Sequence, residues 1–333
     1  MIVTTNFNNS TEDMARYEEK DDIRRFCIKN HLDGMEYMRI PQCPEDKVPM
    51  ELIQGIHLSS YQSWMDLWLR KKKVLLEEYG SMEVVEQLYG GITPQTLIEN
   101  LRGELNQAQA LGAKYVVFHV SEVKIIESFT HRFQYTDREV ITAAAELINQ
   151  VLDAEDYSFD FLMENLWWPG MNLMNPEITE ELLEHVHYEK KGIMLDTGHL
   201  LHTNIGLHSQ EEGVDYILQV LDRNRQIKSY IKGIHLNQSL TGDVACDMKQ
   251  RLESGEIRLK TDYWERFAQV YSYIFQLDQH KPFTAAGVKG LVEEIAPEYL
   301  TFEFITRNRV EHERYLQAQW SALTPDRRGK IIC

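Results

Sequence analysis

The chain has 333 residues, of which 43% are hydrophobic, 26% charged and 10% aromatic. This ordinary globular composition excludes collagen-like, disordered and coiled-coil proteins. The 52 acidic and 35 basic side chains give a formal net charge of −17. Because nucleic acids and acidic membrane surfaces are bound through basic groups, this charge argues against tight nucleic-acid binding and against a membrane-surface role.

The cysteines and the hydropathy pattern bear on the cellular compartment. No C-x-x-C pair occurs among Cys27, Cys43, Cys246 and Cys333, so neither a disulfide framework nor a zinc knuckle is predicted. The first residues carry no basic segment followed by an apolar stretch, and no apolar run approaches the length of a membrane span. We therefore expect a cytoplasmic protein with reduced thiols and no membrane partner. A homo-oligomer is compatible with the sequence.

Short apolar runs alternate with longer amphipathic stretches along the chain. The runs typical of strands cover residues 2–6, 34–38, 54–59, 115–120, 159–165, 192–196, 231–236 and 300–305. The stretches with helical periodicity cover residues 12–31, 93–111, 137–152, 177–187, 210–221, 263–275 and 284–295. Eight strands alternating with helices predict an α/β fold with a parallel sheet closed into a (β/α)₈ barrel. A doubly wound open sheet is the alternative, but it gives no reason for polar residues at the end of nearly every strand.

The sequence contains no segment that is typical of a linker between domains. No Gly-, Ser- or Pro-rich linker and no low-complexity tract divides the sequence, so we expect one domain over residues 1–333. Two connections are long, at about 60–112 and 237–298, and we predict that they are insertions after strands. Loops of this length at the mouth of a barrel usually shape a substrate pocket.

Six consecutive predicted strands, the third to the eighth, end in a residue that can bind a metal. These residues are His57, His119, Glu164, Asp196, His235 and Glu303. The strand ends of a barrel converge on one face, so the three carboxylates would repel one another unless a divalent cation lay between them. Mixed imidazole and carboxylate ligands suit Zn, Mn, Fe or Co better than Ca. A single histidine in an apolar strand is more often a core residue, but recurrence at successive strand ends favours a metal site.

These residues also resemble a known family. Asp196-Thr-Gly-His199 follows one strand, Glu164-Asn the preceding strand and His235-Leu-Asn the next, and Glu303 lies in the last strand. This arrangement is similar to that of the xylose isomerase-like TIM barrels, the superfamily of sugar isomerases and epimerases, inosose dehydratases and endonuclease IV (AP endonuclease family 2). The resemblance extends over most of the chain.

The resemblance implies roles for individual residues. In the isomerases and epimerases, the residues that match Glu164, Asp196, His235 and Glu303 hold one divalent metal. Glu164 and Glu303 would also be the catalytic residues that move the substrate proton.

In the endonuclease IV family, three metals use those four residues and five more. The five matching residues here are His57, His119, His199, Asp278 and His280. The Asp278-Gln-His280 pair lies far along the chain from His235, across an insertion, and a surface helix end is the alternative for it.

Substrate-binding candidates follow the strand ends. Trp64 precedes Trp68 by four residues, so the two share a helix face, and Trp167 and Trp168 follow Glu164 closely. Such rings can stack on a sugar, although packing at the barrel rim is the alternative for at least one of each pair. Arg307 can meet a phosphate or a carboxylate, with simple surface placement as the alternative. No P-loop or dinucleotide fingerprint is present, so no nucleotide cofactor is predicted.

Two enzymatic functions remain open on the sequence. The leading hypothesis is a divalent-metal-dependent isomerase or epimerase, or a related lyase. It acts on a small polar substrate such as a sugar, a sugar phosphate or a polyol, by proton transfer next to a metal-bound oxygen. The alternative is a multi-metal phosphodiester hydrolase resembling endonuclease IV, which the additional histidines favour and the negative charge opposes. A binding barrel without turnover is disfavoured because the candidate acid and base residues are intact.

Overall fold

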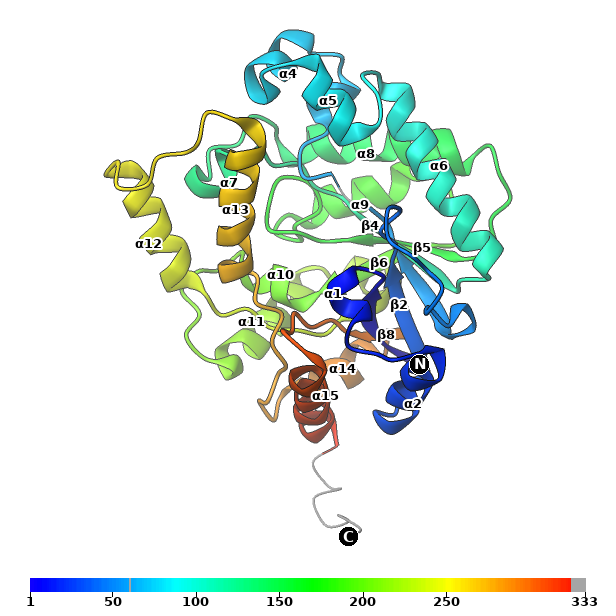
Figure 1. Ribbon diagram of the computed structural model, residues 1–333. Coiled ribbons are helices and arrows are strands. Elements are labelled where there is room, and N and C mark those ends of the chain that lie inside the picture. The colour runs from blue at the N-terminus through cyan, green and yellow to red at the C-terminus, as the bar shows by residue number, and fades with distance from the viewer. Residues whose placement is uncertain (60, 325–333) are drawn as a thin grey trace.

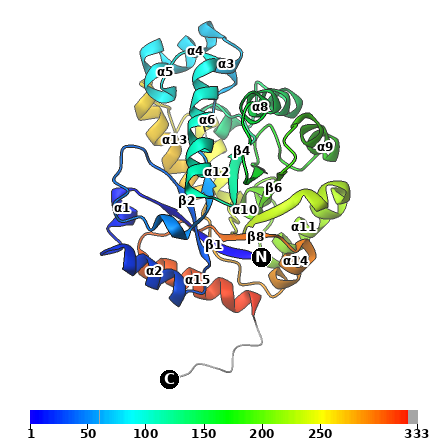
Figure 2. The same cartoon turned by 90° about the vertical axis from the view of Figure 1, so that its right-hand side faces the viewer.

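The computed structural model describes residues 1–59 and 61–324, so Ser60 and Cys333 lie outside the described part. Eight parallel strands close into a barrel in chain order, with helices packed around it (Figures 1 and 2). The strands are β1 (Ile2–Asn8), β2 (Gly34–Met38), β3 (Ile53–His57), β4 (Tyr115–His119), β5 (Asp160–Glu164), β6 (Lys191–Asp196), β7 (Ile231–His235) and β8 (Tyr299–Phe302). The predicted (β/α)₈ barrel is confirmed.

The helices cover the outside of the barrel and its mouth. They are α1 (Thr11–Met14), α2 (Lys20–Lys29), α3 (Met65–Trp68), α4 (Lys72–Tyr79), α5 (Met82–Tyr89), α6 (Pro94–Leu111), α7 (Glu127–Thr130), α8 (Asp137–Leu152), α9 (Pro176–His185), α10 (Thr197–Leu201), α11 (Gln210–Arg223), α12 (Gly242–Glu253), α13 (Tyr263–Leu277), α14 (Val288–Ile295) and α15 (Arg309–Leu323). Short 3₁₀ helices cover Met50–Leu52 and Arg225–Tyr230.

Two predicted helices differ from the structure. The stretch 12–31 is two helices, because Glu19 adopts an extended backbone immediately before α2 and interrupts the periodicity. The predicted helix 284–295 begins only at Val288. The backbone N–H groups of Thr284 and Ala285 instead donate to the Gln210 side chain, at 2.6 and 3.0 Å, which holds this segment outside the helix.

The two long connections carry helices of their own. The first contains α3, α4 and α5 before the barrel helix α6, and α3 packs against α6 and α8. The second contains α12 and α13, of which α12 packs against α7 (Figure 1). No helix in the described part of the chain is long and apolar enough to cross a membrane. Within the same part, Cys27, Cys43 and Cys246 are free thiols.

The strand alternation produces two separate apolar cores. Outward-facing residues pack against the helices and form the larger core. The smaller core fills the inside of the barrel and consists of Tyr115, Val117, Leu162, Met194 and Tyr299, with Ile2 packed against it. Successive residues of a strand face opposite sides, so every second residue points into the barrel. The inward-facing residues that follow those of the smaller core lie nearer the carboxyl ends of the strands. Those positions hold polar side chains.

Candidate metal centre

The Glu164 carboxylate lies among four imidazole rings at the carboxyl ends of the strands. Strand pairing places Glu164 of β5 opposite His119 of β4. Its Oε2 is 3.1 Å from His119 Nε2 and 3.3 Å from His57 Nε2. Its Oε1 is 3.2 Å from Nδ1 of both His199 and His235. The predicted convergence of these strand ends therefore occurs around one fully buried carboxylate.

A second carboxylate, Glu303, joins the centre immediately after β8. Its Oε2 lies 3.3 Å from His235 Nδ1 and 3.4 Å from His280 Nδ1. His280 Nε2 is in turn 2.8 Å from Asp278 Oδ2, which is also 3.4 Å from His199 Nε2. The surface alternative for the Asp278 and His280 pair is therefore wrong. The chain returns from α13 to the barrel mouth and inserts both side chains among the others.

The Asp-Thr-Gly-His element has a local structure that explains its residue types. Asp196 ends β6 and caps α10, where its Oδ1 accepts a 2.6 Å hydrogen bond from the backbone N–H of His199. Its Oδ2 accepts from the Asn237 amide at 2.9 Å. A Cβ at Gly198 would lie 1.9 Å from Asn237 Oδ1, so only glycine allows this approach. The Asn165 side chain exchanges two hydrogen bonds with the Asp196 backbone, at 2.9 and 3.0 Å.

The donor atoms form four overlapping groups in which all ligand atoms lie within 4.8 Å of one another. The groups are His57, His119 and Glu164; Asp196, His199 and His280; Glu164, Asp196, His235 and Glu303; and Glu36, His57, His235 and Glu303. Several buried atoms at the centre have no hydrogen-bond partner of good geometry within residues 1–59 and 61–324. They are Glu36 Oε1, His119 Nε2, Glu164 Oε2, His280 Nδ1 and Glu303 Oε2. Buried polar atoms are normally satisfied, so this set of donors fits divalent cations of the Zn, Mn, Fe or Co type.

The two glutamates of the centre have opposite pKa shifts. Burial alone would raise the pKa of Glu164, but the imidazoles of His119 and His235 outweigh it and hold this pKa well below its ordinary range. Burial raises the pKa of Glu303 to about 7, because His235 and His280 compensate for it only in part. The protein environment therefore ionises one carboxyl and leaves the other close to its titration point at neutral pH.

Sequence reasoning missed two residues of the centre. Glu36, in β2, is buried inside the barrel and contacts His235. A charged residue between Met35 and Tyr37 in an apolar run was the available signal. His202 lies just after α10, and its Nε2 is 3.4 Å from Asp278 Oδ1. Its signal was the three-residue spacing from His199, which places both rings on one helical face.

The predicted aromatic residues lie around the centre in different ways. The Trp167 ring packs against two histidine rings, and its centroid lies 5.2 Å from that of His199 and 4.5 Å from that of His202. Trp168 is buried, and its ring centroid lies 4.2 Å from that of Trp167. Trp64 is also buried, and its indole N–H donates to the Ser121 carbonyl at 2.8 Å.

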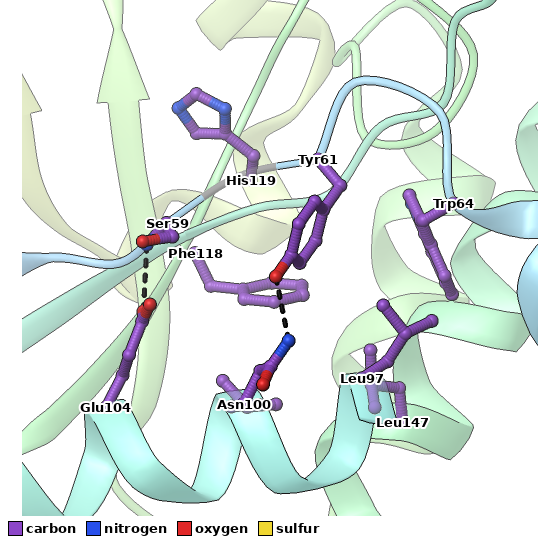
Figure 3. A pocket seen from close by; sticks show the side chains of 10 residues that line it. Ser59, Tyr61, Trp64, Leu97, Asn100, Glu104, Phe118, His119 and Leu147 are labelled. Atoms are coloured by element: carbon purple, nitrogen blue, oxygen red, sulfur yellow. Dashed lines mark hydrogen bonds between the residues drawn. The ribbon is translucent and has the colours of Figure 1, made fainter. Parts of the chain in front are cut away.

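Trp64 lines a pocket between α6 and β4, together with Tyr61, Asn100 and Phe118, and His119 of the metal centre borders the same pocket (Figure 3). The Tyr61 hydroxyl accepts a hydrogen bond from the Asn100 amide in this pocket, at 2.8 Å. Arg307 lies away from the centre. Its side chain is 86% exposed and pairs with Glu311 of α15 at 2.9 Å.

Comparison with known proteins agrees with this architecture. A protein from Rhodospirillum rubrum named after xylose isomerase aligns with a TM-score of 0.57 and 13% identity, over 98% of this chain and 99% of that one. Endonuclease IV from Thermus thermophilus aligns with a TM-score of 0.53 and 13% identity, over 98% of this chain and all of that one. At this identity the likeness shows the fold alone, and no curated protein matches the sequence. Residues 50–284, more than half of the chain, match the model of one family, and the protein therefore belongs to the xylose isomerase-like TIM barrel family.

Proposed function

We propose that this protein is a multi-metal hydrolase that cleaves phosphodiester bonds. The observation that carries the proposal is the size of the centre. Every residue of the predicted ligand set, and not only the four that one ion needs, has a ligand atom within 3.7 Å of another member. The motifs of the chain also resemble those of the endonuclease IV family, in which such a set holds three metals.

The grouping of the ligands supports more than one ion. Glu164, Asp196, His235 and Glu303 supply four donors, which is enough for a single ion. A one-metal centre would leave the remaining imidazoles without a ligand function. Glu164 is shared with the group that contains His57 and His119, and Asp196 with the group that contains His199 and His280. Each of these two carboxylates therefore belongs to two candidate ligand groups, as residues that would serve more than one ion do.

The chain's own residues would define how a substrate enters and where protons go. Bound ions of this kind lower the pKa of water and neutralise the charge of a phosphate group. His119, Asp278 and Glu303 have side-chain exposures of 20, 13 and 11%, whereas Glu164, Asp196 and His235 are fully buried. A substrate would therefore reach the centre past these three side chains. Burial holds the pKa of Glu303 at about 7 before any ion binds, and an ion bound to this carboxylate would lower it, so Glu303 would be ionised and able to accept a proton at neutral pH.

The charge of the protein narrows the substrate class. With a formal net charge of −17, the chain would repel a long polyanion at moderate ionic strength. We therefore favour a small phosphodiester over DNA or RNA. Trp167, which packs against His199 and His202 beside the centre, could stack on an aromatic or sugar group of such a substrate.

A metal-dependent isomerase or epimerase is the second candidate, and one observation favours it. The opposite pKa shifts of Glu164 and Glu303 resemble those of an acid and base pair, since before any ion binds one group is ionised and the other is close to half-protonated at pH 7. In this function, the two glutamates would exchange a proton with a carbon of a sugar or a polyol. Four donors for one ion are sufficient for this chemistry.

The metal content and two activity assays distinguish the candidates. The purified protein is analysed for bound metals by mass spectrometry and incubated with bis(p-nitrophenyl) phosphate. In parallel, a panel of sugars is incubated with the protein in deuterated water. Two or three metal equivalents with phosphodiester cleavage would support the hydrolase. One equivalent, deuterium on a sugar carbon and no phosphodiester cleavage would contradict it and support the isomerase.

Variants sharpen this comparison. His57→Ala and His280→Ala change groups that only the multi-metal function needs, so we expect loss of phosphodiester cleavage by about two powers of ten or more. Glu164→Gln and Glu303→Gln should reduce sugar exchange by about two to four powers of ten if the isomerase is correct. His187→Ala is the matched control, because this histidine is 63% exposed and pairs with Asp153 away from the centre.

A further inference from the structure

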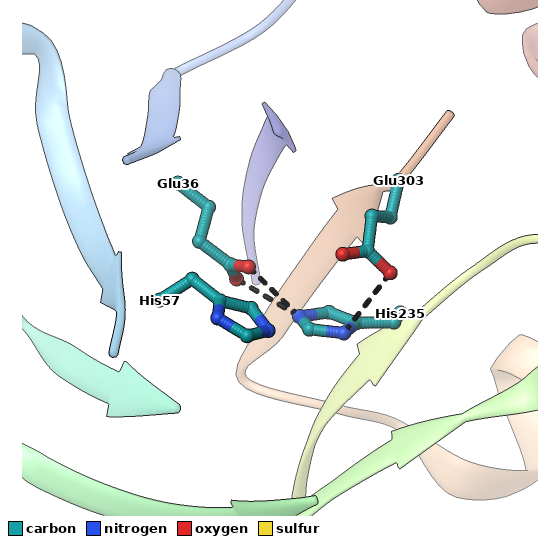
Figure 4. Close-up of side chains that lie close together, drawn as sticks. All are labelled: Glu36, His57, His235 and Glu303. Carbon is teal, nitrogen blue, oxygen red and sulfur yellow. Dashed lines mark hydrogen bonds and ion pairs between the residues drawn. The ribbon is translucent and has the colours of Figure 1, made fainter. Parts of the chain in front are cut away.

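We propose that Glu36 is a positioning residue that holds the His235 ring so that its Nδ1 points into the metal centre. This inference rests on the proposed metal-binding function of His235. Glu36 lies on β2, which supplies no predicted ligand, and its side chain crosses the inside of the barrel to reach β7 (Figure 4). Both its oxygens lie near His235 Nε2, Oε1 at 2.9 Å and Oε2 at 3.1 Å.

The two nitrogens of His235 face opposite environments. Nε2 faces Glu36, whereas Nδ1 lies 3.2 Å from Glu164 Oε1, 3.3 Å from Glu303 Oε2 and 3.7 Å from Asp196 Oδ2. A carboxylate that accepts the Nε2 proton fixes the tautomer in which Nδ1 carries the free lone pair. Metal-binding histidines commonly donate their other N–H to a carboxylate in this way, which orients the ring and increases its basicity.

Glu36 is itself held in place by hydroxyl groups inside the barrel. Its Oε2 accepts hydrogen bonds from the Tyr115 hydroxyl at 2.8 Å and from the Thr301 hydroxyl at 2.9 Å, and the Thr4 hydroxyl contacts both. The Tyr115 ring fits only because residue 55 is glycine, since a Cβ there would lie 2.2 Å from the ring. Barrel interiors are normally filled by branched apolar residues, and burying a carboxylate is strongly unfavourable unless it is paired. A set of buried partners around one carboxylate therefore indicates a specific role.

Direct metal binding by Glu36 is the competing interpretation, because Glu36 also belongs to one of the four ligand groups. The hydrogen bonds argue against it. Oε2 already accepts from Tyr115, Thr301 and His235. Oε1 makes no hydrogen bond of good geometry, but it lies 2.9 Å from the same Nε2 of His235, on the side that an ion would need. An ion at Glu36 would have to displace the N–H group of His235. We therefore place Glu36 behind the ligand rather than among the ligands.

The test compares metal affinity in three variants of the full-length protein. Zn²⁺ affinity and stoichiometry are measured by competition with a chromophoric chelator, and the Co²⁺-loaded proteins are compared by visible absorption. For Glu36→Gln we expect 10- to 100-fold weaker binding, an unchanged number of bound ions and an altered Co²⁺ spectrum. Thr301→Val removes a bond that holds Glu36 and should weaken binding in the same direction, by a smaller factor.

Thr5→Val is the matched control. Thr5 is as buried as Thr301 and lies on the neighbouring strand, but its hydroxyl bonds His312 and the Phe302 carbonyl on the outer side of the barrel. It should lose stability without changing metal affinity. Thermal unfolding of all variants separates loss of fold from loss of affinity.

Several outcomes would overturn the inference. Two of them concern Glu36→Gln: a metal affinity within twofold of that of the wild-type protein, or the loss of one whole metal equivalent. The others are an equal loss of metal affinity in Thr5→Val and Thr301→Val, and a wild-type protein that binds no metal. The proposed function fails separately, when the wild-type protein binds its metals and cleaves no phosphodiester. In that case the affinity ratios still test the role of Glu36.

Discussion

Glu122 should make the stability of the protein depend on pH in a direction opposite to that of most carboxylates. It follows β4 at the barrel mouth, where its buried carboxylate accepts hydrogen bonds from the Ser63 hydroxyl at 2.8 Å and from the backbone N–H groups of Trp64 and Met65 at 2.6 and 3.1 Å. It thereby ties the first long connection to the strand end beside His119. Burial nevertheless raises the pKa of Glu122 from 4.5 to about 7, because the cost of desolvation exceeds the gain from these bonds.

The sign and size of the effect follow from proton linkage. Between pH 4.5 and 7 the folded protein retains the Glu122 proton and the unfolded chain has released it, so the free energy of unfolding falls as the pH rises. Each pKa unit corresponds to about 1.4 kcal/mol, so the full difference amounts to about 3 kcal/mol. Glu122→Gln is neutral at every pH. The unfolding free energy of the variant should therefore rise relative to wild type by about 3 kcal/mol between pH 4.5 and 8.

Urea denaturation, followed by tryptophan fluorescence at several pH values in buffer containing EDTA, measures this difference. Taking the difference between variant and wild type cancels the other titrating groups and the metal centre. Glu139→Gln is the control, because bonds from the Thr136 backbone and hydroxyl lower the pKa of Glu139 below its ordinary 4.5. The contribution of Glu139 to stability is therefore lost only as the pH falls below 4.5, and the difference between this variant and wild type should stay flat over the range in which Glu122 titrates. The reasoning would be refuted if the difference in unfolding free energy between Glu122→Gln and wild type stayed constant within about 0.5 kcal/mol from pH 5 to 8.

Two further predictions concern the metal centre and its glycine. Asp196→Ala and His235→Ala should each release metal under mild chelation that leaves the wild-type protein loaded, because one donor of the central group is lost; full metal occupancy in both variants would contradict the ligand assignment. Gly198→Ala should cost about 1–3 kcal/mol of unfolding free energy and weaken metal binding, since the new Cβ would lie 1.9 Å from Asn237 Oδ1. Gly103→Ala is its control, because nothing lies within 4 Å of a Cβ in that helix, and a gain of about 0.5–1 kcal/mol is expected there.

Much of the architecture could be read from the sequence. The alternation of apolar runs and amphipathic stretches predicted all eight strands, because a parallel strand buried on both faces needs a continuous apolar run. The polar residue at the end of each of the last six runs was visible for the same reason, since it interrupts the apolar pattern. Once the barrel is closed, His57, His119, Glu164, Asp196, His235 and Glu303 must converge on one face.

The remaining members of the centre depend on tertiary structure. Asp278 and His280 reach it because the chain returns from α13 to the barrel mouth, and sequence spacing across an insertion does not determine that path. Glu36 sits in the middle of a short apolar strand, where only the register of the closed barrel decides that it faces inward, towards His235, rather than outward. Side chains alternate between the two faces of a strand, so a shift of one residue would have placed this carboxylate against the helices instead of behind the metal ligand.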